Sequence, residues 1–357
     1  MTSTRRAYVD WLRGIAVLAM IEWHVIDAWS IPSGRDGVVW IVVKTVGGFA
    51  APLFLFLAGV AVPYAIRARR QRGAAPAEAA WLVQKRGWQI FGLAHVFRLQ
   101  SFLLNPNARW SSLLKPDILN VLGLGLAATA WAAGRAHSAK QRVWWLLVPV
   151  ITIVVLTPLS RMWWWPTLLH PRLEAYIRPV ANFGVFSLFP WVAFVPLGAF
   201  IGARLAGARD DGEERAQLWQ LARMGGVAVA IGVAAIWIGR AAAVEFWTGE
   251  AGLFAIRAGV MMLALGASWW IVSVQPARAV DPVLLLGRTS LFVYWVHVEL
   301  AYGVFSYPLH HTLPLAWSAL GFVLMTWAMY IAAGWWANRP ARPWIPEHIR
   351  ATSTAEG

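Results

Sequence analysis

The sequence predicts an all-α fold: a polytopic integral membrane helix bundle of ten or eleven transmembrane helices, with both termini cytoplasmic. Three observations lead to this prediction. Of the 357 residues, 59% are hydrophobic and only 13% are charged, whereas soluble domains carry about 25% charged residues. Apolar runs of spanning length recur along the chain, and basic residues gather in alternate connections between them. The composition excludes a soluble enzyme and a disordered chain.

Ten apolar runs are candidate spans, because a bilayer core of about 30 Å needs roughly 20 apolar residues per helix. In chain order they are residues 14–31, 39–66, 87–104, 118–134, 143–159, 183–203, 224–242, 251–274, 289–306 and 315–337. The first run follows Arg5 and Arg6, as the apolar part of a signal peptide would. However, Glu22 and His24 interrupt it and no small-residue cleavage site follows, so we interpret it as the first transmembrane helix.

The basic residues give the orientation of the chain through the positive-inside rule. With the N-terminus in the cytoplasm, about 21 Lys and Arg fall on the inner side, and the outer side holds only Arg35, Arg109, Lys115, Arg161, Arg172 and Arg178. The net charge of +14 is therefore topogenic, and we expect no nucleic-acid partner. The connections contain no linker or repeat, so we interpret residues 1–357 as a single transmembrane domain with cytoplasmic ends at 1–13 and 338–357.

The first predicted helix holds the densest set of ionisable residues. Burying each of them in a membrane costs about 2.5–3.5 kcal/mol on insertion scales, so we treat such residues as candidates for function. Arg13 and His24 share one face, about 16 Å apart along the axis, and Asp10 reaches Arg13 at i,i+3. Histidine is suited to removing a proton from a nucleophile and returning it to a leaving group. We expect Asp27, or a carboxylate from another helix, to orient the His24 ring. The alternatives are a structural histidine and a solvated helix end at Asp27.

Other predicted spans also contain polar side chains, for which ion pairing between helices is an equal alternative to catalysis. Glu250 precedes Arg257 by seven residues on nearly the same face and can neutralise it. In the ninth span His297 shares a face with Ser290 and Tyr294, and Glu299 does not. The remaining polar residues of this kind are Lys44, His95, Arg98, Asn120 and Arg288.

The outer connections offer two weaker signals. Residues 160–184 contain Trp163, Trp164 and Trp165, which are typical of an interfacial aromatic belt, with a sugar-stacking platform as the alternative. His310 and His311 have no spaced partner and the chain has no Cys, so we expect no metal.

Four segments together have the pattern of a known family. The run Arg6-Ala-Tyr-Val-Asp10-Trp-Leu-Arg13-Gly14, followed by His24, resembles the opening helix of the transmembrane acyltransferase superfamily. The chain is most similar to bacterial proteins like the heparan-alpha-glucosaminide N-acetyltransferase catalytic domain. That likeness extends to three further segments, Ala51-Pro52-Leu-Phe54-Leu-Phe-Leu-Ala-Gly59, Phe189-Pro190-Trp191 through Pro196-Leu-Gly198-Ala, and Leu286-Gly287-Arg288-Thr-Ser290-Leu-Phe-Val-Tyr294-Trp-Val-His297.

The resemblance implies an enzyme of the bacterial plasma membrane that transfers an acyl group, usually acetyl from acetyl-CoA, to a hydroxyl or amine of a saccharide at the outer face. It implies that His24 is the catalytic histidine and that Arg13 lines the CoA route. Some relatives that acetylate amines carry a histidine in the first outer loop, and residues 31–38 contain none. Because of this departure we assign the proton transfer to His24, with His297 as the alternative residue.

Several assignments combine the resemblance with the residues above. We assign catalytic roles to His24, Asp27 and His297, and acyl-CoA binding to Asp10, Arg13, Arg98, Asn120 and Arg288. The cytoplasmic cations Arg67, Arg69, Arg70, Arg72, Lys85 and Arg86 suit the donor's diphosphate, although they also serve topology alone. The rival class is a transporter or flippase for a polar or glycan substrate. The sequence leaves the oligomeric state open, with a homodimer among the alternatives.

Overall fold

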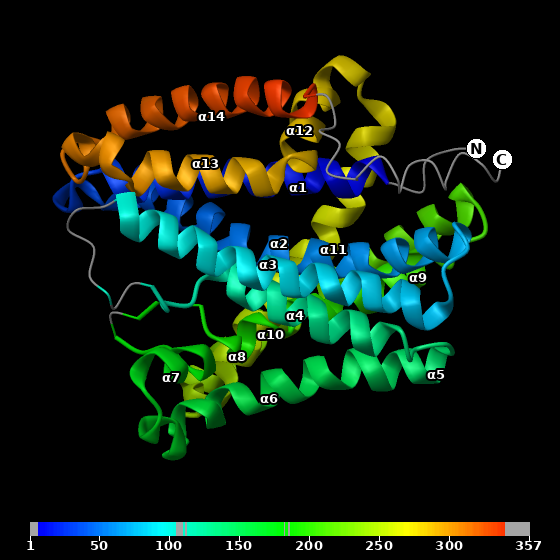
Figure 1. The fold of residues 1–357 in the computed structure, drawn as a ribbon. Coiled ribbons are helices and arrows are strands. Elements are labelled where there is room, and N and C mark those ends of the chain that lie inside the picture. Colours follow the sequence, from blue (N-terminus) through cyan, green and yellow to red (C-terminus); the bar gives the residue numbers. More distant parts are fainter. Residues whose placement is uncertain (1–5, 105–109, 111–112, 182, 185, 340–357) are drawn as a thin grey trace.

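Long helices form almost all of the computed structural model, which describes residues 6–104, 110, 113–181, 183–184 and 186–339 (Figure 1). The helices are α1 (Ala7–Trp29), α2 (Gly37–Gln71), α3 (Pro76–Leu104), α4 (Ile118–Ala133), α5 (Ala139–Arg142), α6 (Val148–Met162), α7 (Pro171–Ile177), α8 (Leu188–Trp191), α9 (Phe194–Leu205), α10 (Asp211–Ala241), α11 (Glu245–Val274), α12 (Ala277–Arg288), α13 (Ser290–Tyr302) and α14 (Leu315–Ala337). Within these ranges there is no β-strand, only two isolated bridges. The all-α prediction is confirmed.

Each of the ten predicted runs overlaps at least one helix, but fewer helices are long and apolar enough to cross a membrane by themselves. In the described part of the chain six qualify: α2, α10, α14, Ala139–Met162, Leu188–Leu205 and Thr248–Val274. A seventh span results if Val280–Arg288 and Ser290–Tyr302 are joined across their 82° bend. Helix α4 has only 16 residues, and α1 carries four charged side chains. A count of ten or eleven therefore stays a prediction.

The two ends of the bundle differ in the connections that they gather. The first turn of α1 and the last turn of α14 lie at the same end, together with α5 and the connection between α2 and α3 (Figure 1). Helix α7 lies at the opposite end. The basic connections that were predicted to be cytoplasmic therefore lie together at one end of the bundle. Residues 1–5 of the predicted N-terminal end and residues 340–357 of the predicted C-terminal end lie outside the described residues.

Small residues let the central helices approach closely, as in other membrane bundles. A Cβ at Gly59 of α2 would lie 2.0 Å from the Val195 carbonyl oxygen of α9, and one at Gly287 of α12 would lie 1.9 Å from the Asp10 carbonyl oxygen of α1. The buried core beside these contacts includes the stacked rings of Phe194 and Phe254, with centroids 4.6 Å apart. These contacts fix α1 against α12, and the sharp bend after α12 directs α13 along the other half of α1.

Candidate active site

The two histidines assigned from the sequence meet at the centre of the site. His24 Nδ1 of α1 lies 2.8 Å from His297 Nε2 of α13, and the two rings stack with centroids 5.1 Å apart. His297 Nδ1 lies 2.6 Å from the Val293 carbonyl oxygen, one turn earlier on its own helix. His297 is completely buried. The sequence placed both histidines on helix faces but did not predict that they touch.

The hydrogen-bond partners assign the proton positions in this neutral pair, since such positions follow from the network. A carbonyl oxygen only accepts, so His297 Nδ1 must carry the proton and donate it to Val293. His297 Nε2 is then an acceptor, so the His24 Nδ1–H group donates to it. His24 Nε2 is then the unprotonated nitrogen, and no hydrogen bond to it forms within the described residues. The hydrogen bonds from His24 to His297 and from His297 to the Val293 carbonyl oxygen therefore leave His24 Nε2 as the nitrogen that can act as a base.

Asp27 was expected to orient the His24 ring, and the structure gives the carboxylate other partners. Its Oδ2 accepts a hydrogen bond of 2.9 Å from the Tyr302 hydroxyl, and its Oδ1 lies 3.4 Å from Arg35 Nη1. The Tyr302 ring packs edge-on against His24, with centroids 5.5 Å apart. Among the described residues, Asp27 therefore reaches His24 through Tyr302, because His297 already occupies His24 Nδ1.

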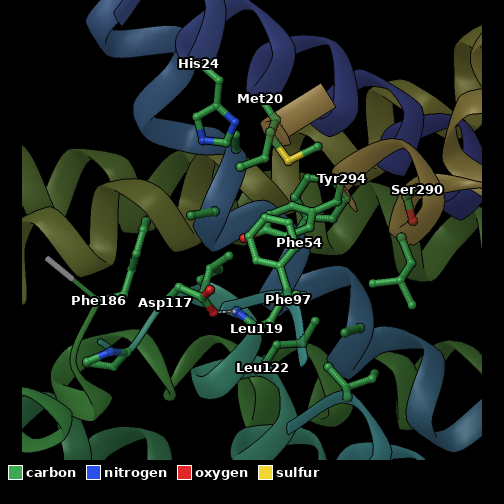
Figure 2. Close-up of a pocket in the computed structure, with 18 of the residues that line it drawn as sticks. Met20, His24, Phe54, Phe97, Asp117, Leu119, Leu122, Phe186, Ser290 and Tyr294 are labelled. Atoms are coloured by element: carbon green, nitrogen blue, oxygen red, sulfur yellow. Dashed lines mark hydrogen bonds between the residues drawn. The ribbon is translucent and has the colours of Figure 1, made fainter. Parts of the chain in front are cut away.

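His24 faces a large cavity of about 1510 Å³ that runs along the bundle. Figure 2 shows His24 projecting from its helix into this pocket, with Phe54, Phe97 and Asp117 further along its wall. Lys44 and Arg69 both line it and are 25 positions apart on α2, so they are separated by about 37 Å along the axis. The cavity is thus about as long as a bilayer is thick.

The residues assigned to donor binding divide into two groups. Near the first turns of α1, Asp10 Oδ1 pairs with Arg13 Nη1 at 3.0 Å and Asp10 Oδ2 with Arg288 Nε at 3.7 Å. Of these three residues, Arg13 lines the cavity. Further residues of the cavity wall near this end are Arg69, in the last turn of α2, and Arg86, in the first half of α3.

The second group lies on the wall formed by α3 and the start of α4. Arg98 Nη2 pairs with Asp117 Oδ2 at 3.3 Å, and both residues line the cavity together with Lys115. Burial lowers the pKa of Lys115, and the positive charge of Arg98 adds to that effect. Asn120 does not line the cavity, because its side chain and that of Asp117 close the capping box at the start of α4. Sequence reasoning missed Asp117, although an Asp before an apolar run with Asn three residues later signals such a cap.

The structure gives two further carboxylates partners from distant elements. Glu299, which was placed on another face than Ser290 and Tyr294, lines the same cavity as these residues and accepts a hydrogen bond from Ser101. Glu250 was expected to neutralise Arg257, and its charge does act on Arg257. Its carboxylate, however, forms its ion pair with Arg161 in the last turn of α6.

The remaining sequence candidates lie away from the cavity. Trp163 stacks on Trp165, with ring centroids 5.8 Å apart, and the segment is held by Arg178, which donates to the Trp163 carbonyl oxygen. These tryptophans are not among the lining residues. His310 Nε2 lies 3.1 Å from Ser306 Oγ. In the described ranges no group of three His, Cys, Asp or Glu residues is placed to hold a metal ion.

Comparison with known proteins gives one result. Residues 5–246 match the family model described as heparan-alpha-glucosaminide N-acetyltransferase, catalytic. The match covers about two-thirds of the chain and includes His24 and most of the cavity wall, but it ends before α13 and His297. No curated protein matches the chain.

Proposed function

The chain belongs to the heparan-alpha-glucosaminide N-acetyltransferase catalytic-domain family, an integral-membrane acyltransferase family, and on that premise we propose its reaction. It moves an acyl group, acetyl in the first instance, from cytoplasmic acyl-CoA to a hydroxyl or amine of a saccharide at the outer face of a bacterial plasma membrane. The observation that carries this proposal is the unprotonated Nε2 of His24 on the wall of a cavity about as long as a bilayer is thick.

The proposed orientation puts the end with Arg69 and Arg86 in the cytoplasm. Basic connections favour the cytoplasmic side, and these connections gather at the end where α1 begins and α14 ends (Figure 1). The donor then enters where the cavity wall is cationic, and the acceptor enters from the end near Lys44 and Tyr302. In this orientation α1, α3 and α4 also cross the membrane, which gives ten spans.

His24 acts as the general base and then as the general acid. Its Nε2 takes the proton from the acceptor hydroxyl or amine while the acceptor atom attacks the thioester carbonyl carbon. When the tetrahedral adduct collapses, the C–S bond breaks and His24 returns the proton to the leaving thiolate. His24 ends neutral, and the products are the acylated saccharide and free CoA.

His297 is a positioning residue in this scheme. It is buried behind His24, and its bond to the Val293 carbonyl oxygen fixes which nitrogen of each ring is protonated. When His24 is protonated, its Nδ1–H group still donates to His297 Nε2, so the imidazolium keeps its partner without any rearrangement. A buried histidine thus takes the role that a carboxylate has in other acyl-transfer sites.

The polar side chains on the rest of the wall suit the two substrates. Arg13, held by Asp10, faces the donor route. The pair Arg98 and Asp117 lies with Lys115 on the wall across from α1, where it offers donors and acceptors to the hydroxyl groups of a saccharide. Because Asn120 is used within the cap of α4, we assign it to shaping that wall rather than to direct contact.

Sealed vesicles containing the purified protein test the reaction and its sidedness. Labelled acetyl-CoA is supplied on the face carrying the α2–α3 connection and a saccharide mixture on the other. We expect labelled saccharide to accumulate on the second side only when both substrates are present. Movement of unmodified saccharide without acetyl-CoA, and no labelled product, would contradict the proposal and support a transporter.

A further inference from the structure

Arg257 lies inside α11 and lines the cavity, and among the described residues no carboxylate lies within ion-pair distance of its guanidinium. The charge of Glu250 acts on Arg257 from further away, because the Glu250 carboxylate is paired with Arg161. The guanidinium carbon of Arg257 lies 5.2 Å from the centre of the Trp191 ring, and both residues line the cavity. A cation inside a span is expensive and marks a functional site by default.

The contact with Trp191 leaves the hydrogen-bonding groups of Arg257 available. A cation over an aromatic ring is attracted by the electrons of the ring face and uses none of its N–H donors. Arginine has five such donors in a planar fork that matches the oxygens of a phosphate or carboxylate. Trp191 therefore holds the guanidinium in place while Arg257 stays free to bind an anion in the cavity.

The packing of the helices gives the depth of Arg257 relative to His24. Gly47 of α2 packs against Trp23, next to His24, and Gly59 of α2 packs against Val195. The two glycines are about 18 Å apart along α2. Trp191 precedes Val195 by one turn, which places it about 6 Å back toward the level of His24. The contact of Trp191 with Arg257 therefore lies about 12 Å from the level of His24, in the direction of Arg69 and Arg86. Arg13 lies about 16 Å from His24 in the same direction along α1.

The donor has its own fixed length. Thirteen bonds join the nearer phosphorus of the CoA diphosphate to its sulfur, and an extended chain gains about 1.2 Å per bond, as a peptide does, so the arm spans about 15 Å. With the thioester at His24, the diphosphate falls at the depth of Arg257 and Arg13. Arg69 is 22 positions beyond Gly47 on α2, about 33 Å, too far for the diphosphate and suited to the 3′-phosphate end.

We propose that Arg257 binds the diphosphate of the acyl-CoA donor inside the bundle, with Trp191 holding its guanidinium in place. This inference rests on the proposed function. It assigns a donor-binding residue beyond the stretch that matches the family, which ends at residue 246. It also moves the diphosphate from the exposed cytoplasmic cations to the interior of the cavity.

Binding of three ligands to the purified full-length protein tests the assignment. The ligands are CoA, dephospho-CoA, which lacks the 3′-phosphate, and pantetheine, which has no phosphate. Arg257→Gln should weaken CoA and dephospho-CoA about 10- to 100-fold, the range expected for a charge-assisted contact, and leave pantetheine unchanged. Arg69→Gln should weaken CoA and leave dephospho-CoA unchanged. The matched control is Arg215→Gln, since Arg215 also lies over a tryptophan ring but is exposed and outside the cavity wall.

Two results would overturn the inference while leaving the proposed function intact. One is a wild-type protein that binds CoA and an Arg257→Gln variant that binds it equally well. The other is an equal loss for pantetheine, which would show a packing effect. If Arg257→Gln does not fold, Arg257→Lys must still weaken CoA and dephospho-CoA relative to pantetheine, because lysine lacks the planar fork. A wild-type protein that binds no CoA would instead contradict the acyl-CoA reaction itself.

Discussion

His24 Nδ1 and His297 Nε2 lie 2.8 Å apart although 273 positions separate the two residues in the chain. The contact joins the first long helix to the broken pair near the C-terminal end. It decides which nitrogen of His24 faces the cavity as a base, because His297 is itself fixed by the Val293 carbonyl oxygen.

Replacing His297 should slow the chemical step and spare donor binding. His297→Ala removes the acceptor for His24 Nδ1, so the ring loses its fixed orientation and protonation. We expect kcat to fall about 10- to 100-fold, as for other groups that orient a reacting histidine, with the KM for acetyl-CoA nearly unchanged. Steady-state kinetics in vesicles measure both constants. A roughly 10- to 100-fold rise in KM with an unchanged kcat would show instead that His297 contacts the substrate.

Replacing Asp27 should have a smaller effect on the rate than replacing His297. Asp27→Asn keeps the shape of the side chain and weakens its interactions with Arg35 and Tyr302, neither of which touches His24 Nδ1. We expect kcat to fall less than about tenfold and the protein to lose about 0.5–1.5 kcal/mol of stability, the usual value for one hydrogen bond. A loss of rate as large as that of His297→Ala would return the orienting role to Asp27.

The stability of the protein should rise with pH in a range set by Lys115. Burial, reinforced by the charge of Arg98, lowers the pKa of Lys115 below its usual 10.5. Between the lowered value and 10.5 the unfolded chain binds more protons than the folded one, so stability increases with pH and levels off above 10.5. Lys115→Gln should remove this slope and raise the melting temperature near pH 7. An unchanged slope in the variant would assign it to another group.

The close contact between α1 and α12 should not tolerate a methyl group. Gly287→Ala would place a Cβ 1.9 Å from the Asp10 carbonyl oxygen, so the helices must separate, at a cost of about 1–3 kcal/mol. Thermal unfolding should show a lower melting temperature. Gly92→Ala is the control, since nothing lies within 4 Å of a Cβ there and helix propensity predicts a gain of about 0.5–1 kcal/mol. Equal behaviour of the two variants would contradict the packing.

Helix positions could be predicted from the sequence because apolar length and positive flanks are local signals. His24, Arg13 and His297 were also found locally, each as a polar residue in an apolar run. The contact between His24 and His297 could not be predicted, since it depends on how α13 turns after α12. Local spacing gave only part of the surroundings of Glu250: its charge acts on Arg257 as expected, but its ion pair is with Arg161 at the end of α6, a residue distant in the chain.

The central claim is that His24 Nε2 is the base for acyl transfer, and one comparison tests it most directly. Transfer from labelled acetyl-CoA is measured in vesicles for the wild type, His24→Ala and His137→Ala, in which the replaced histidine is exposed and outside the cavity. Binding of CoA serves as the check that each variant folds. We predict that His24→Ala binds CoA within about twofold of the wild type and transfers at least about 100 times more slowly, the lower range for a general base, while His137→Ala matches the wild type. Transfer at the wild-type rate by a folded His24→Ala variant would contradict the claim.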